Sequence, residues 1–235
     1  NLHSEEIHNF NFTQPRMSSH LWLYEGVTEY FAHLCQVRDS LTDDDTFMKT
    51  MRDKIEDAAT YKDVSFTEMS RQILTEEYRD MYGNVYEKGA LIAFLLDIRL
   101  TELSNGKMSL RDLMQQLSAK YGPGKPFKDA DLIPEIVAMT YPEIGTFFER
   151  FVIGNDPLPY QAYFDKIGWN YFYTRDDSVA SFGKFSMHYD QKTERFIISR
   201  VKEENRFGLL NGDQLIRVNE KEITYKNFES VLEPV

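Results

Sequence analysis

The sequence predicts a mainly α-helical domain followed by a small β-rich domain. Between about Ser18 and Gly168, apolar residues recur every three or four positions and are punctuated by helix caps and breakers. Beyond Gly168, short runs alternate between apolar and polar residues and are separated by turn residues, which is typical of strands. Of the 235 residues, 42% are hydrophobic and 14% aromatic, as in folded proteins. The predicted domains are residues 1–180 and 181–235.

The predicted helices of the first domain follow one another with short breaks. Ser18 or Ser19 can cap a helix whose apolar positions include Leu23 and Val27. The segment from Tyr86 to Leu103 is apolar on nearly all sides, which predicts a central buried helix. Further helices are expected from Thr42 and the aspartates that follow it, from Ser65 or Thr67 to about Met81 with Gly83 and Asn84 closing it, from Ser109 to Lys120, from Asp129 to Met139, from Pro142 to Val152 and from Tyr160 to Lys166.

The β-rich part shows two alternating runs and the start of one more helix. Phe196–Val201 and Gln214–Val218 are predicted strands, because their apolar residues alternate and turn residues flank them. Asn227–Leu232 is expected to begin a helix.

Charge and hydropathy exclude several classes of partner. The formal net charge is -11, and no basic face is visible, which argues against nucleic acid as a partner. The best apolar run, Ala90–Leu96, is too short to cross a bilayer, so we expect no transmembrane segment. The single Cys35 cannot form an internal disulfide, and its apolar helical surroundings predict a buried thiol. The cellular location stays unknown.

Two short strings contain the residues best suited to chemistry. Leu21–Gly26 (LWLYEG) offers Glu25, a carboxylate early in an amphipathic helix, and Val85–Ala90 (VYEKGA) offers Tyr86 at the start of a very apolar helix. In zinc peptidases such residues accompany His-Glu-x-x-His, a helical turn with two imidazole ligands and a general base. That motif does not occur in these 235 residues.

Trp-x-x-Glu-Gly followed by Tyr-x-Lys-Gly-Ala resembles the gluzincins, zinc metallopeptidases whose third ligand is a glutamate on a separate helix. Within that group the chain is most similar to the glycyl aminopeptidases, which carry a PDZ domain near the C-terminus. Four further stretches fit that family: GALIAFLLDIRL (89–100), SLRDLMQQL (109–117), FFERFVIGNDPLPYQAY (147–163) and GLLNGDQLIRVN (208–219). The resemblance implies the C-terminal half of a thermolysin-like catalytic domain, followed by a PDZ-like domain that is present in part. The His-Glu-x-x-His segment would then lie upstream of Asn1.

The resemblance implies zinc as the cofactor and Glu25 as one of its ligands. A catalytic zinc uses three protein ligands and keeps one position open for water. Trp22 and Gly26 flank Glu25 as the family pattern requires, and the glycine would allow close helix packing. Taken alone, without the second motif and the resemblance, Glu25 would be interpreted as an exposed acidic residue on a helix.

Glu29 lies one helical turn beyond Glu25 on the same face. It is a candidate second-shell residue, which would accept a hydrogen bond from the distal nitrogen of a zinc-bound histidine. The alternative is a solvated acid or a salt-bridge partner.

Tyr86 is the candidate catalytic residue. As water attacks a peptide carbonyl, negative charge builds on the oxygen, and a phenol held nearby can donate a hydrogen bond to it. The family's Tyr-x-Lys-Gly string places its tyrosine in this role; the alternative is a buried core tyrosine among the 14 of this chain. Lys88 is expected to order the turn by ion pairing.

The five histidines lack the spacing of a helical zinc pair. Structural or solvated roles are therefore expected for all of them, namely His3, His8, His20, His33 and His188.

A possible peptide-binding loop lies in the β-rich domain. By resemblance to PDZ domains, Phe182, Gly183, Lys184 and Phe185 would form the carboxylate-binding loop. The implied partner is a C-terminal peptide, which such domains capture by strand addition.

Two functional hypotheses follow. The first is a part of a zinc metalloaminopeptidase that hydrolyses peptide bonds after small N-terminal residues such as glycine, with peptides as substrates. The alternative is a non-catalytic peptide-binding module, a helical scaffold with a PDZ groove, from a degenerate homologue. Since one carboxylate cannot supply three ligands, the isolated chain is expected to bind zinc weakly.

Overall fold

The computed structural model describes residues 2–122, 124–173, 185–201, 208–218, 220–228 and 231. Contacts divide the chain into two units, Asn1–Phe172 and Tyr173–Val235. Each unit has its own hydrophobic core. The boundary predicted from the sequence, between residues 180 and 181, falls outside the described residues and stays a prediction.

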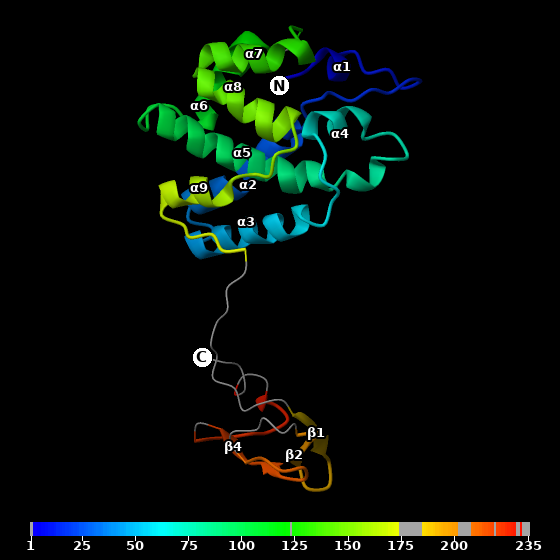
Figure 1. Ribbon diagram of the computed structural model, residues 1–235, viewed down its shortest axis with the longest axis vertical. Coiled ribbons are helices and arrows are strands. Elements are labelled where there is room, and N and C mark those ends of the chain that lie inside the picture. The colour runs from blue at the N-terminus through cyan, green and yellow to red at the C-terminus, as the bar shows by residue number, and fades with distance from the viewer. Residues whose placement is uncertain are drawn as a thin grey trace. The chain divides into compact units, whose positions relative to one another are not determined.

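The first unit is built from helices (Figure 1). In chain order these are α1 (Glu5–His8), the π-helical turn η1 (Trp22–Gly26), α2 (Val27–Arg38), α3 (Asp44–Ala58), α4 (Phe66–Gln72), the 3₁₀ turn η2 (Arg79–Met81), α5 (Asn84–Leu103), α6 (Leu110–Lys120), α7 (Asp129–Met139), α8 (Pro142–Phe148), the π-helical turn η3 (Glu149–Ile153), α9 (Tyr160–Phe164) and the 3₁₀ turn η4 (Asp165–Ile167).

Helix α5 is the centre of this unit. It runs between α3 on one side and α7 and α8 on the other (Figure 1). Val85, Leu91, Leu95 and Leu100 along its length are completely buried. A helix that is apolar on every side requires neighbours on every side, so the central position predicted for residues 86–103 is confirmed.

Polar side chains begin several helices as the sequence predicted. Asp43 caps α3 by accepting a hydrogen bond from the Thr46 backbone amide at 2.8 Å. Ser109 and Asp112 form a reciprocal capping box at the start of α6. These local bonds satisfy amides that have no partner within the helix.

Three local predictions were wrong. The helix expected to reach Met81 ends at Gln72, where the Thr75 amide and hydroxyl both bond to the Gln72 carbonyl and form a turn. Gly83 and Asn84 do not close that helix; they begin α5, with the Asn84 side chain buried. Ser18 and Ser19 do not cap the helical turn that begins at Trp22: Ser18 Oγ and the Ser19 amide donate to the Asp129 carboxylate, and Ser18 Oγ accepts from the His20 amide.

Cys35 also departs from its prediction, because its side chain is exposed rather than buried. Helix α2 turns Val27 and Tyr30 into the core, and Cys35 lies on the outer face. The periodicity of the apolar residues predicted the helix correctly, but it did not predict which face of the helix is exposed.

The second unit contains short antiparallel strands. These are β1 (Ser186–Asp190), β2 (Arg195–Ser199), β3 (Gln214–Leu215), β4 (Arg217–Val218) and β5 (Lys221–Glu222), arranged as a β1-β2-β3 sheet and a β4-β5 pair. Tyr189 lies opposite Phe196, and Phe196 lies opposite Leu215. Phe196, Val218 and Ile223 form the buried core of this unit.

The strand predictions are confirmed with altered limits. Gln214–Val218 is interrupted at Ile216, whose carbonyl accepts a hydrogen bond from the Ile223 amide at 3.0 Å. In the predicted peptide-binding loop, Phe182, Gly183 and Lys184 lie outside the described residues, and Phe185 is half-buried just before β1. The PDZ assignment therefore stays a prediction.

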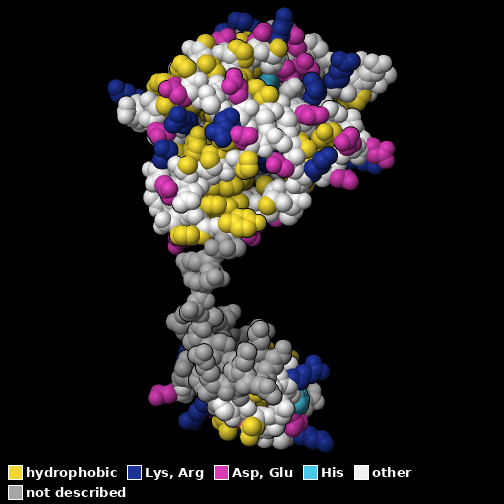
Figure 2. Space-filling model, viewed as in Figure 1, with side chains coloured by type: hydrophobic (Ala, Val, Ile, Leu, Met, Phe, Trp, Pro, Cys, Tyr) yellow, Lys and Arg dark blue, Asp and Glu magenta, His cyan; other side chains and the backbone are white. Residues whose placement is uncertain are grey.

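The surface shown in Figure 2 mixes charged and apolar side chains. On this face of the helical unit, acidic and basic groups are interspersed, with apolar side chains between them. Among the residues that the structure describes, no helix has both the length and the apolar character needed to cross a membrane.

Candidate active site

A close glycine contact joins the two motifs singled out in the sequence. Gly26 ends η1, and Gly89 lies in the second turn of α5. A Cβ atom added to Gly26 would lie 2.4 Å from the Gly89 carbonyl carbon and 2.5 Å from its oxygen. Only two residues without side chains allow this approach. The two motifs thus pack against each other through the backbones of their glycines.

Glu25 lies within the π-helical turn, directly before this contact. Trp22, which begins the turn, is completely buried, while Glu25 is only half-buried. Single π-helical turns are rare in proteins, and those that occur are often found at functional sites. Such a turn changes the direction of the side chains on one turn of the helix. The motif therefore fixes its tryptophan in the core and leaves its carboxylate within reach of solvent.

Tyr86 lies beside Glu25. Hydrogen bonding with the Tyr82 side chain raises the pKa of the Tyr86 phenol, and burial together with the negative charge of Glu25 raises it further. The rings of Tyr82 and Tyr86 meet edge to face with centroids 5.9 Å apart. The structure thus places Glu25 and Tyr86 close enough to interact, and Tyr86 remains protonated at neutral pH.

Glu29 is held by two basic side chains. Its Oε1 atom accepts a hydrogen bond from Lys54 Nζ at 2.7 Å and lies 3.1 Å from His33 Nε2. Burial opposes ionisation, but the bonds from Lys54 and His33 outweigh it and lower the pKa of Glu29. The salt-bridge role left open in the sequence is therefore present, and no donor from the described part of the chain binds Oε2.

Lys54 also reaches the second motif. Its Nζ lies 3.1 Å from Glu87 Oε2, next to Tyr86 in the chain. The side chain of Lys54 is only 8% exposed. Sequence reasoning missed this residue, since nothing local distinguishes Lys54 from the other lysines of α3.

Lys88 forms the ion pair expected of it. Its Nζ lies 3.3 Å from Asp63 Oδ1. This contact ties the first turn of α5 to the loop that precedes α4, which supports a structural role.

His20 has a structural role next to the first motif. It is buried, accepts a hydrogen bond at Nδ1 from the Trp22 indole at 3.2 Å, and lies 2.8 Å from the Asp129 carbonyl through Nε2. Because the indole can only donate, Nδ1 carries no proton and Nε2 donates to the carbonyl. Burial lowers the pKa of His20, consistent with a neutral ring.

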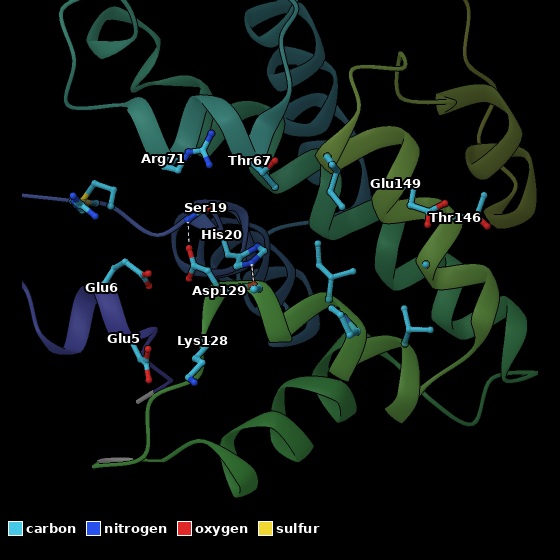
Figure 3. Close-up of a pocket in the computed structure, with 18 of the residues that line it drawn as sticks. Glu5, Glu6, Ser19, His20, Thr67, Arg71, Lys128, Asp129, Thr146 and Glu149 are labelled. Carbon is cyan, nitrogen blue, oxygen red and sulfur yellow. Dashed lines mark hydrogen bonds between the residues drawn. The ribbon is translucent and has the colours of Figure 1, made fainter.

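A separate cleft of about 1270 Å³ lies between α1, α4, α7 and α8. Figure 3 shows the Asp129 side chain bonded to Ser19, with Glu6 near it and Thr146 and Glu149 on the opposite wall. Burial raises the pKa of Glu6, and the nearby Asp129 carboxylate adds to this effect. Neither Glu25 nor Tyr86 lines the cleft, so it is distinct from the motif pair.

A complete metal site is absent from the described residues. No three histidine, cysteine, aspartate or glutamate side chains there lie close enough together to bind one ion. Glu25 is a suitable carboxylate donor, but one donor is fewer than the three that a catalytic zinc requires.

Comparison with solved structures supports the fold. The chain resembles the crystal structure of an aminopeptidase N family protein from Idiomarina loihiensis, with a TM-score of 0.62 and 22% sequence identity over 98% of this chain. The chain spans 43% of the length of that protein. At this identity the likeness shows the fold and leaves the function open. Comparison with curated proteins gave no match.

Comparison with protein families bears on both motifs. The M61 glycyl aminopeptidase family model matches residues 1–92, a range that contains Glu25, Glu29, Tyr86 and both contact glycines. The family predicted from the motifs is thereby confirmed over this range: residues 1–92 carry the sequence pattern of the M61 glycyl aminopeptidases.

Proposed function

We propose that this chain is part of a zinc aminopeptidase and contributes one metal ligand, Glu25, and one transition-state residue, Tyr86. The observation that carries the proposal is the Gly26–Gly89 contact, which brings the two motifs together. Core tyrosines and surface glutamates do not require such a contact. A site whose groups must stay in a fixed relation does.

The electrostatic surroundings of Glu25 fit a metal ligand. Within the described part of the chain, no lysine, arginine or histidine pairs with its carboxylate. Glu29 and Glu87, by contrast, are both paired with Lys54. Glu25 therefore keeps its charge available. Zinc, when bound, would activate a water molecule and polarise the peptide carbonyl.

Tyr86 would act as a hydrogen-bond donor. Its phenol is kept protonated by Tyr82, burial and Glu25. A protonated phenol beside the reacting carbonyl stabilises the negative charge that develops on its oxygen. The bond strengthens in the transition state, so the phenol contributes more to turnover than to substrate binding.

Glu29 would orient a histidine ligand. Lys54 and His33 both contact Oε1, and this arrangement leaves Oε2 available for the N–H of an imidazole. The two alternatives considered for Glu29 are therefore compatible. An anchored, ionised carboxylate is the better acceptor for such a bond.

The family match supports a proposal for the substrate class. We infer cleavage after small N-terminal residues such as glycine, since residues 1–92 match the glycyl aminopeptidases. We also propose that residues 182–185 bind the C-terminal carboxylate of a peptide in a PDZ-like groove.

The test is hydrolysis of a glycyl amide by the full-length protein before and after zinc removal. A chelator should abolish turnover, and added zinc should restore it. A full-length protein that binds no zinc and hydrolyses no amide, yet binds peptides, would support the non-catalytic module instead.

A further inference from the structure

We propose that Lys54 is a positioning residue that holds Glu29 and Tyr86 in register, an inference that rests on the proposed function. Lys54 belongs to α3, which contains neither motif. It nevertheless pairs with one carboxylate on α2, which continues from the first motif, and with one on α5, which contains the second.

The link consists of two short ion pairs to a single ammonium group. Lys54 Nζ lies 2.7 Å from Glu29 Oε1 on α2 and 3.1 Å from Glu87 Oε2 on α5. Glu29 is one helical turn beyond Glu25, and Glu87 directly follows Tyr86. Each carboxylate is thus rigidly connected to one proposed functional group.

Burial makes this link strong. The Lys54 side chain is 8% exposed, while those of Glu29 and Glu87 are 30% and 24% exposed. Removing the ammonium would leave two partly buried carboxylates close together, with only His33 as a basic partner of Glu29 and none for Glu87 among the described residues, which is unfavourable. The helices would separate locally, and the site would loosen at both motifs.

The link also determines which oxygen of Glu29 is available. Lys54 and His33 converge on Oε1, so the carboxylate cannot rotate without losing both contacts. Lys54 thereby fixes Oε2 as the acceptor for a zinc-bound histidine. Loss of such outer contacts typically lowers metal affinity or activity about 10- to 100-fold.

The test compares Lys54→Met with Lys54→Arg in the full-length, zinc-loaded protein. Lys54→Met should lower kcat about 10- to 100-fold and weaken zinc binding, with KM little changed. Lys54→Arg keeps the charge and should recover most of both losses. Lys49→Met is the matched control: Lys49 lies on α3 but forms an exposed pair with Asp53, so its loss should change neither quantity.

A second variant tests the Lys54–Glu87 ion pair separately from the Lys54–Glu29 pair, and it replaces Lys54→Met if that variant does not fold. Glu87→Gln weakens only the pair with the second motif, so kcat should fall while zinc affinity stays. A normal kcat and zinc affinity in Lys54→Met would overturn the positioning role, even if the variant were less thermally stable. If Lys54→Met does not fold, a normal kcat in Glu87→Gln would overturn it. If the wild-type protein is an active zinc enzyme, that result rejects only the role of Lys54. If the wild-type protein shows no zinc-dependent hydrolysis, both the proposed function and the role of Lys54 are rejected.

Discussion

At the scale of single residues, the two glutamates of the first motif differ in their partners. Glu29 is held by Lys54 and His33, while Glu25 interacts with the phenol of Tyr86 and forms no ion pair in the described part of the chain. Sequence alone treats both as acids on one helical face. The difference between them depends on Lys54, which comes from another helix.

His20 predicts a pH dependence of stability. Its folded-state pKa is lowered by burial below the value of 6.5 for an unperturbed histidine. The neutral ring therefore contributes stability that is fully present above pH 6.5 and is lost as the pH falls toward the folded-state pKa. Protonation at Nδ1 would also break the bond from Trp22.

The measurement is the melting temperature between pH 7 and pH 5. The wild-type protein should lose stability over this interval, and His20→Gln should show a flatter dependence from a lower starting value. His8→Gln, at an exposed position at the end of α1, should keep the wild-type slope. Equal slopes in all three proteins would exclude His20 as the origin of the acid sensitivity.

At the scale of elements, the contact between η1 and α5 determines whether the site can form. Gly26→Ala would place a methyl group 2.4 Å from the Gly89 carbonyl carbon, which is backbone and cannot turn aside. We expect about 1–3 kcal/mol of destabilisation from overpacking. The kcat should fall by more than the loss of folded protein explains, because Glu25 and Tyr86 would move apart.

Gly145→Ala is the matched control for this substitution. Gly145 lies within α8, and its added methyl group would meet only the Val137 side chain at 3.4 Å. Its expected effect is near neutral or a stabilisation of about 0.5–1 kcal/mol, from the better helix propensity of alanine. Chemical denaturation of both variants compares the two; a Gly26→Ala protein as stable and active as Gly145→Ala would show that the contact is not required.

The same contact shows what the sequence could and could not predict. Glu25, Tyr86 and their glycines were found because each lies in a short local string. Lys54 was missed because its partners lie 25 and 33 residues away, so only the folded chain brings them together. The prediction that Cys35 is buried was wrong for a related reason. Helical periodicity does not say which side of an apolar helix packs against neighbours.

At the scale of the whole molecule, the proposed site residues all belong to one of the two units. Two units with separate cores are present, and the motif pair belongs entirely to the first. The chain spans 43% of the aminopeptidase N family protein that it resembles, and its described residues hold no group of three metal-binding side chains. A zinc ion bound by Glu25 would therefore need further ligands from outside the described residues.

The most direct test of the central claim is zinc content and kcat, measured together in Glu25→Gln and Tyr86→Phe of the full-length protein. Glu25→Gln keeps the size of the side chain but removes its charge, so zinc and turnover should fall together. Tyr86→Phe removes only a hydroxyl, so zinc should remain while kcat falls about 100- to 1000-fold, the usual effect of losing one oxyanion donor. Full zinc retention in Glu25→Gln, or near-normal kcat in Tyr86→Phe, would contradict the assignment of that residue.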